Sequence, residues 1–213
     1  MKEGYRNITD KLPAKVEKLY DAVIHLMEEG KNLSSLTVAE ITEKAGIGKG
    51  TAYEYFRSKE EMIARAILYG ILRSFEEIEH RIGRLSSFEA KYVEVLNWLE
   101  EIFQEKGSLA VLCQVSRDSM QISGALKQEA IDVGYSPEMI FNHMDCLLYD
   151  EEGNVLIKSE LSMEIQKCTI FSSFVNFWIY INRNSELPEE KIKNYKTYLH
   201  RCLIHNLQAE GVQ

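Results

Sequence analysis

The sequence has few of the residues that interrupt or cross-link a chain. It contains three prolines in 213 residues, and between them apolar residues recur every three or four positions. That spacing is typical of amphipathic helices, so we expect an all-α fold. The hydrophobic content of 45% and the charged content of 27% are ordinary for a globular protein with a substantial core.

The sequence also lacks the features of secreted, membrane-spanning and catalytic proteins. Its four cysteines form no C-x-x-C pair, which predicts reduced thiols in a cytoplasmic protein. The N-terminus has no apolar signal-type stretch, and the most apolar segment, residues 168–181, is too short to span a bilayer. His143 and Cys146 would supply only two metal ligands, and no nucleophile stands beside a base. We therefore expect no metal, no cofactor, no membrane partner and no enzyme activity.

Charge is divided unevenly along the chain. Residues 1–60 carry ten basic and ten acidic side chains, and the remainder carries 15 and 23, which accounts for the net charge of −8. This asymmetry predicts two domains with different partners. A neutral N-terminal segment is not in itself an argument for nucleic-acid binding, because strong binders usually have a basic face.

Helix-start and helix-stop residues divide the first 60 positions into short elements. An apolar stripe over residues 12–29 ends at Gly30. Thr37 and Glu40 have the spacing of a capping box, which predicts a short helix that ends at Gly46. A second short helix follows over residues 48–57.

Further capping patterns predict longer helices in the rest of the chain. Ser58 with Glu61, and Ser86 with Glu89, have capping-box spacing. Apolar periodicity predicts the last two helices at 162–182 and 188–208. Tyr149 to Lys158 is left open between an acidic loop, which is favoured, and a small hairpin.

Two short helices joined by Gly46-Ile47-Gly48 are too small to bury a core alone. Packed against the preceding helix, they would form the three-helix unit of helix-turn-helix DNA readers. The helical repeat places Ala52 and Phe56 toward the core and Gly50, Thr51 and Glu54 on the outer side, with Tyr53 and Tyr55 on the flanks. Such a face suits a major groove, where flanking hydroxyls can reach phosphates. Glu54 either accepts a hydrogen bond from a cytosine amino group or repels phosphate.

The glycine-rich run at 46–51 has an alternative interpretation as a nucleotide loop. A Walker loop requires G-x-x-x-x-G-K-[ST] after a strand, whereas here Lys49 precedes a glycine and a helix comes before it. The spacing of a dinucleotide-binding glycine motif fails as well. Neither nucleotide site is expected.

Residues 41–61, with the central run Ala45-Gly-Ile-Gly-Lys-Gly-Thr-Ala-Tyr-Glu-Tyr-Phe56 and then Ser58-Lys-Glu-Glu61, resemble the N-terminal signature of TetR/AcrR-family regulators. Two positions depart from it: Gly48 stands where Ser or Thr is common, and Ala52 where a larger aliphatic residue is usual. The resemblance implies DNA contact through Thr37, Gly48, Lys49, Gly50, Thr51, Tyr53, Tyr55 and Lys59.

The same resemblance implies a homodimeric repressor on a palindromic double-stranded DNA operator, released by a small-molecule inducer. Residues 1–58 would form the helix-turn-helix domain and residues 59–213 a larger helical ligand-binding and dimerisation domain. The alternative for the second domain is a ligand-independent interaction or dimerisation module. The candidate pocket residues are Trp98, Phe103, Phe141, Phe171 and Trp178. The candidate dimer-interface residues are Phe174, Phe177, Ile181, Tyr195, Leu199 and Cys202.

Overall fold

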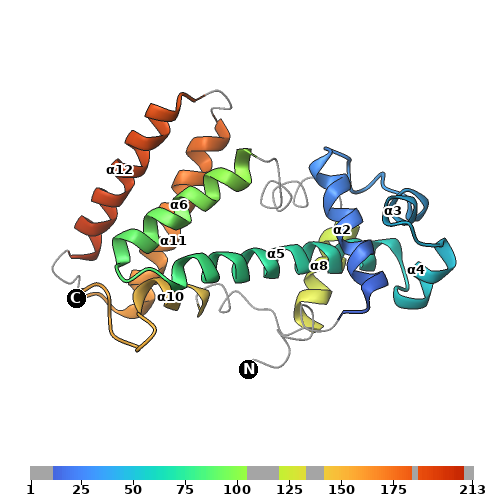
Figure 1. Ribbon diagram of the computed structural model, residues 1–213, viewed down its shortest axis with the longest axis horizontal. Helices are drawn as coiled ribbons and strands as arrows, with labels where there is room; N and C mark the ends of the chain where they lie inside the picture. The colour runs from blue at the N-terminus through green and yellow to red at the C-terminus, as the bar shows by residue number, and fades with distance from the viewer. Residues whose placement is uncertain (1–11, 105–119, 133–141, 184–186, 209–213) are drawn as a thin grey trace. The chain divides into compact units, whose positions relative to one another are not determined.

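A computed structural model describes residues 12–104, 120–132, 142–183 and 187–208 of the chain. The predicted all-α fold is confirmed for these residues, which form helices and no strand (Figure 1). The helices are α2 (Ala14–Glu28), α3 (Val38–Ala45), α4 (Lys49–Tyr55), α5 (Lys59–Gly83), α6 (Phe88–Gln104), α8 (Met120–Asp132), α10 (Asp145–Leu148), α11 (Met163–Arg183) and α12 (Glu189–Leu207). None of these helices is both long and apolar enough to cross a membrane.

The first of two compact units contains α2, α3, α4, α8 and the part of α5 up to Glu76. Its core includes Leu19, Leu33, Ile41 and Ile63, which are fully buried. Arg65 of α5 donates from Nε to Glu129 Oε2 of α8 at 2.8 Å, and both side chains are at least partly buried. An ion pair thus joins α8 to the same unit as the three N-terminal helices.

The second unit contains α6, α10, α11, α12 and the part of α5 that begins at Glu77. The last two helices lie side by side and run in opposite directions (Figure 1). Tyr92 of α6 is fully buried, and its hydroxyl donates to Ser173 Oγ of α11 at 3.1 Å. Burial raises the pKa of Tyr92 to about 12, so it is a neutral donor at any physiological pH. The division between the two compact units lies inside α5. The predicted boundary after residue 58 separates a DNA-binding from a ligand-binding domain by function, and it stays a prediction.

The capping box predicted at the start of α3 is confirmed. Thr37 N donates to Glu40 Oε2 at 2.9 Å, and Glu40 N donates to Thr37 Oγ1 at 3.2 Å. The hydrogen bonds from the hydroxyl and then the amide of Thr37 lower the pKa of Glu40. The helix ends at Gly46, whose φ of 65° is the left-handed conformation that glycine adopts at little cost.

Two other capping predictions need correction. Ser87, not Ser86, caps α6, because Ser87 Oγ accepts from Ala90 N at 3.2 Å. Ser58 Oγ accepts from Glu61 N at 3.1 Å as predicted, but the Glu61 carboxylate accepts from Arg57 N at 2.7 Å. The reciprocal bond is therefore shifted by one residue.

The segment from Tyr149 to Lys158 contains a tight turn closed by one antiparallel bridge between Tyr149 and Val155. Asp150 N donates to Asn154 O at 3.0 Å, and Gly153 has a φ of 85°. Because a single bridge closes it, the segment has the form of a minimal hairpin, the less favoured of the two alternatives.

Candidate functional site

The helix-turn-helix is anchored through one side of α4. Ala52 is 1% exposed and Phe56 is 3% exposed, as the helical repeat predicts. The Phe56 ring packs against Tyr20 of α2 with 5.8 Å between ring centroids. Because α4 has only seven residues, this buried pair, rather than the helix's own hydrogen bonds, holds it in place.

The opposite side of α4 faces solvent. Lys49, Gly50, Tyr53 and Glu54 are exposed, with Tyr53 at 52%. Thr51 and Tyr55 are half-buried, and Tyr55 packs against the core of the unit. The two predicted flanking tyrosines are therefore unequal: Tyr53 is the more accessible hydroxyl, whereas Tyr55 also serves the core.

No described residue lies close enough to require a glycine at two positions on this surface, Gly48 and Gly50. A Cβ added to Gly48 or Gly50 would meet no atom within 4 Å among the described residues, and neither has a positive φ. Gly48 is the extended N-cap of α4, with φ −68° and ψ 141°. A glycine inside a helix weakens it relative to alanine. The absence of side chains here is consistent with close approach by an external partner.

The lysines around α4 differ in how they are paired. Lys44 Nζ lies 2.6 Å from Glu29 Oε1, and this hydrogen bond lowers the pKa of Glu29. Lys59 Nζ donates to Ser34 O at 3.0 Å. Among the residues that the structure describes, Lys49 has no such partner. Of these three lysines, its ammonium group is therefore the most available to an anion.

Thr37 lies exposed at the start of α3, and its hydroxyl already serves the capping box. Thr37 Oγ1 donates to Glu40 Oε2 at 2.8 Å as well as accepting from Glu40 N. Lys59 and Thr37, which the family resemblance assigns to DNA contact, thus also have intramolecular partners. Contact with DNA by any of the eight named positions stays a prediction.

The predicted pocket residues are only partly described. Trp98 of α6 is 6% exposed, and its buried Nε1 has no hydrogen-bond partner in the described part of the chain. Trp178 is half-buried, whereas Phe171 is 40% exposed on the outer side of α11. The Phe103 side chain and Phe141 lie outside the described residues. Trp98 is therefore the predicted pocket residue whose N–H group could still donate a hydrogen bond to a ligand.

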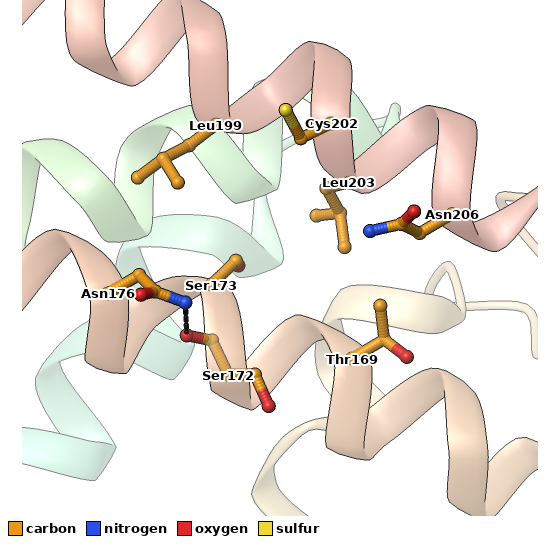
Figure 2. Close-up of a pocket in the computed structure, with 8 residues that line it drawn as sticks. All are labelled: Thr169, Ser172, Ser173, Asn176, Leu199, Cys202, Leu203 and Asn206. Carbon is orange, nitrogen blue, oxygen red and sulfur yellow. Dashed lines mark hydrogen bonds between the residues drawn. The ribbon is translucent and has the colours of Figure 1, made fainter.

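A shallow groove of about 250 Å³ lies between α11 and α12 (Figure 2). It contains none of the predicted pocket residues. Small and polar side chains dominate its walls, and Asn176 Nδ2 donates to Ser172 O at 2.9 Å along α11. The lining residues are Thr169, Ser172, Ser173, Asn176, Leu199, Cys202, Leu203 and Asn206.

Three of the predicted dimer-interface residues are buried within their own chain. Phe177 is 0%, Ile181 3% and Leu199 6% exposed, so they have almost no area left for a partner. Phe174 stacks on Tyr92 and Tyr195 stacks on Tyr180, at centroid distances of 5.3 and 3.8 Å. Cys202 is half-buried and lines the groove. These residues serve the intramolecular core, and the existence of an interface stays a prediction.

A different apolar strip is exposed on the last two helices. The large hydrophobic side chains that face solvent there are Ile165, Phe171, Val175 and Ile179 of α11 and Tyr198 of α12. This strip was not predicted, although the sequence does contain an uncharged repeat at helical spacing, formed by Ile165, Cys168, Ser172, Val175 and Ile179. A search for a second uncharged stripe on α11 would have found it.

Two titratable side chains of the second unit, Cys146 and Lys91, are explained by their surroundings. Burial raises the pKa of the Cys146 thiol to about 12, which makes it a poor nucleophile. Lys91, 3% exposed, donates to the carbonyl oxygens of Cys146 and Tyr149 at 2.8 and 2.9 Å. No group of three possible metal ligands converges in the described residues. Lys91 therefore fixes the end of α10.

Comparison with known proteins places a family match over the helix-turn-helix. Residues 21–66 match the family described as "Bacterial regulatory proteins, tetR family". A "Fatty acid metabolism regulator protein" of Bacillus subtilis (strain 168) is 22% identical over 176 residues, which are 81% of this chain and 88% of that protein. The similarity thus extends well beyond the DNA-reading segment.

Two solved structures share the fold. The transcriptional regulator FadR from Bacillus subtilis, in complex with stearoyl-CoA, superposes with a TM-score of 0.60 at 17% identity, covering 92% of this chain and 99% of that one. The fatty acid degradation regulator FadR from Bacillus halodurans gives a TM-score of 0.64 at 17% identity, with 94% and 100% covered. Both chains of each pair are covered almost completely, so the second, helical unit is part of the shared fold.

Proposed function

We propose that the chain is a regulator of the TetR family, a sequence-specific repressor whose operator binding is released by a small-molecule inducer. The observation that carries this proposal is the outer side of α4. That surface combines an unpaired lysine, an exposed tyrosine and a helical glycine that no contact within the described residues requires. Together these features suit close approach by a second, negatively charged molecule.

In this proposal α4 enters the major groove of an operator half-site. Lys49 and Tyr53 bind phosphates along the groove walls, and Gly50 and Thr51 allow the helix backbone to approach the bases. Tyr55 and Lys59 add contacts from the flank of α4 and the start of α5. Thr37 and Gly48 lie near the backbone of the duplex at the starts of α3 and α4.

We propose that the inducer is a fatty acyl thioester or a related acyl-chain ligand bound in the second unit. Support comes from the similarity to the Bacillus subtilis fatty acid metabolism regulator and from the shared fold with FadR, whose structure contains stearoyl-CoA. Trp98 offers a buried indole N–H, and an unpaired buried donor costs about 1–3 kcal/mol. A ligand acceptor within reach of Trp98 Nε1 would remove that cost. If the second unit bound no ligand, the cost of the unpaired Trp98 donor would remain.

We further propose that two copies pair through α11 and α12. The exposed strip of Ile165, Phe171, Val175, Ile179 and Tyr198 supplies apolar area. The adjacent groove between the two helices has small side chains that permit close helix approach. Pairing of this helix pair with its copy would bury the strip and place two reading helices on a palindromic operator.

The coupling between ligand and operator would run through α5. This helix supplies Ile63 to the core of the first unit and Ile82 to the core of the second. A ligand that changes the packing around the second part of α5 can bias the position of the reading helices. Coupling of about 1–3 kcal/mol, or 5–150-fold in affinity, is typical of such regulation.

Fluorescence anisotropy with duplexes from the DNA upstream of the gene tests the proposal. The full-length protein is expected to bind one such duplex at least about a thousandfold more tightly than a scrambled duplex. Stearoyl-CoA is expected to weaken that binding, whereas free coenzyme A is not. Equal affinity for all duplexes would overturn sequence-specific regulation. Operator binding that no acyl-CoA of any chain length affects would overturn the ligand assignment alone.

A further inference from the structure

Glu54 stands apart on the outer side of α4. It is exposed and lies on the side of the helix opposite the buried Ala52 and Phe56. One turn earlier the same side carries Gly50, which has no side chain, and a Cβ built there would meet nothing within 4 Å. The position one turn before Glu54 therefore carries no side chain, and Thr51, its neighbour three positions earlier, is uncharged.

Two other acidic groups of the N-terminal helices, Glu29 and Glu61, have intramolecular partners. Glu29 pairs with Lys44 at 2.6 Å, and Glu61 accepts from Arg57 N at 2.7 Å. For Glu54 the described residues provide no hydrogen bond and no ion pair. Lys49 precedes it by five positions, which places the two side chains roughly 140° apart around the helix. The charge of Glu54 is therefore uncompensated within the described chain.

We propose that Glu54 is a specificity-determining residue that accepts a hydrogen bond from the N4 amino group of a cytosine in the major groove. The proposal rests on the proposed function. An ionised carboxylate is an acceptor only. In the major groove guanine presents O6 and N7 and thymine presents O4, all acceptors, so both repel it. Adenine presents a donor, N6, but next to the acceptor N7. The adenine amino group also has thymine O4 on its other side, whereas the cytosine amino group has an acceptor, guanine O6, on one side only. Cytosine is therefore favoured.

The alternative is that Glu54 only repels phosphate. Repulsion would weaken binding to every duplex by a similar factor, because phosphates are the same in all sequences. A cytosine contact instead changes affinity at one base pair of each half-site. Loss of hydration from a carboxylate that enters the groove is offset only where a donor meets it. The two alternatives therefore predict different responses to removal of the charge.

Selection from a randomised duplex library separates them, with full-length wild type, Glu54→Gln, Glu54→Ala and Glu43→Gln. Glu43 is an exposed acid at the other short helix of the motif, so Glu43→Gln matches the change in net charge. The wild type is expected to enrich cytosine at one position of each half-site by about tenfold. Glu54→Gln and Glu54→Ala lose that preference and keep the rest of the motif. Glu43→Gln retains the wild-type motif.

Each other outcome counts against the assignment. An unchanged motif in both Glu54 variants overturns it, as does a uniform rise in affinity for all duplexes with no change of preference. A wild-type motif in which no position is enriched in cytosine also overturns the assignment, while leaving the proposed function intact. If the wild-type protein binds no duplex of the library, both the proposed function and the role of Glu54 are overturned. Thermal unfolding of each variant by circular dichroism identifies any loss of fold.

Discussion

Gly50 of α4 is a residue at which the proposed function and the stability of the helix would make opposite demands. Gly50 lies in the first turn of the helix, and no described atom lies within 4 Å of the Cβ that another residue would carry. Alanine there should stabilise the protein by up to about 0.5 kcal/mol, because glycine is a poor helix former. We predict that Gly50→Ala raises the midpoint of urea unfolding and lowers operator affinity. A variant that is stabilised without any loss of affinity would show that no partner approaches Gly50 closely.

Lys49 and Lys44 form a natural comparison of an unpaired and a paired cation. Lys44 lies 2.6 Å from Glu29, whereas Lys49 has no partner among the described residues. Lys49→Ala should weaken binding to all sequences and make the slope of log K against log salt shallower by about two for a dimer, one phosphate contact per protomer. Lys44→Ala should change that slope little. Titrations by anisotropy between about 50 and 200 mM salt, over which the Debye length falls about twofold, measure both. Equal slopes for the two variants would contradict the assignment of Lys49.

The sequence was sufficient for the local geometry of these residues but not for their distant partners. Helical periodicity placed Ala52 and Phe56 in the core and exposed Glu54 on the opposite side. It could not reveal that the Lys59 ammonium donates to Ser34 O, a carbonyl 25 residues earlier in the chain. Such contacts depend on how helices pack, which no local spacing encodes.

At the scale of elements, the capping box of α3 fixes where the helix-turn-helix begins. The hydrogen bonds from Thr37 lower the pKa of Glu40 below its ordinary value of 4.5. A lowered folded-state pKa means that the ionised cap stabilises the fold above the unfolded pKa, and that this stabilisation is lost as pH falls through the folded pKa. We predict that Glu40→Gln destabilises the protein at pH 7 and that the difference from wild type narrows below pH 4.5. Urea unfolding at a series of pH values measures this difference. A difference that stays constant through that range would exclude a role for the ionised carboxylate.

The helix α11 shows why its inward side could not be assigned from sequence. Both of its sides are apolar: Ile170, Phe177 and Ile181 are buried, while Val175 and Ile179 are exposed. The more aromatic stripe was assigned to the dimer interface, but Phe174 stacks against Tyr92 of α6 inside the same unit. Which side turns inward is decided by packing against α6 and α12. The bounds of α11 were predicted to within one residue at each end, but which of its sides faces the core was not predicted.

On the scale of the whole molecule, the proposed pairing of two chains depends on the exposed strip on α11 and α12. We predict that Val175→Glu converts the protein to a monomer, because it places a carboxylate in the proposed apolar interface, where an unpaired buried charge is strongly disfavoured. Val155→Glu is the matched control, since Val155 is 55% exposed in the turn after α10 and Val175 is 37% exposed on α11. Sedimentation velocity measures the masses. A dimeric Val175→Glu protein, or a monomeric Val155→Glu protein, would place the interface elsewhere.

In the proposed function, pairing and DNA affinity are linked, because residues 1–60, which contain the helix-turn-helix, carry no net charge. With roughly six to eight phosphates contacted by a dimer, log K should fall against log salt with a slope of about −5 to −7. A monomer that contacts one half-site should show about half that slope. It should also lose roughly a hundredfold or more in affinity, because the second reading helix is no longer held at high effective concentration. We therefore predict that Val175→Glu halves the salt slope as well as the mass, whereas Val155→Glu changes neither. A monomeric Val175→Glu protein that kept the full wild-type slope would mean that one chain makes all the phosphate contacts, and the two-half-site arrangement would have to be abandoned.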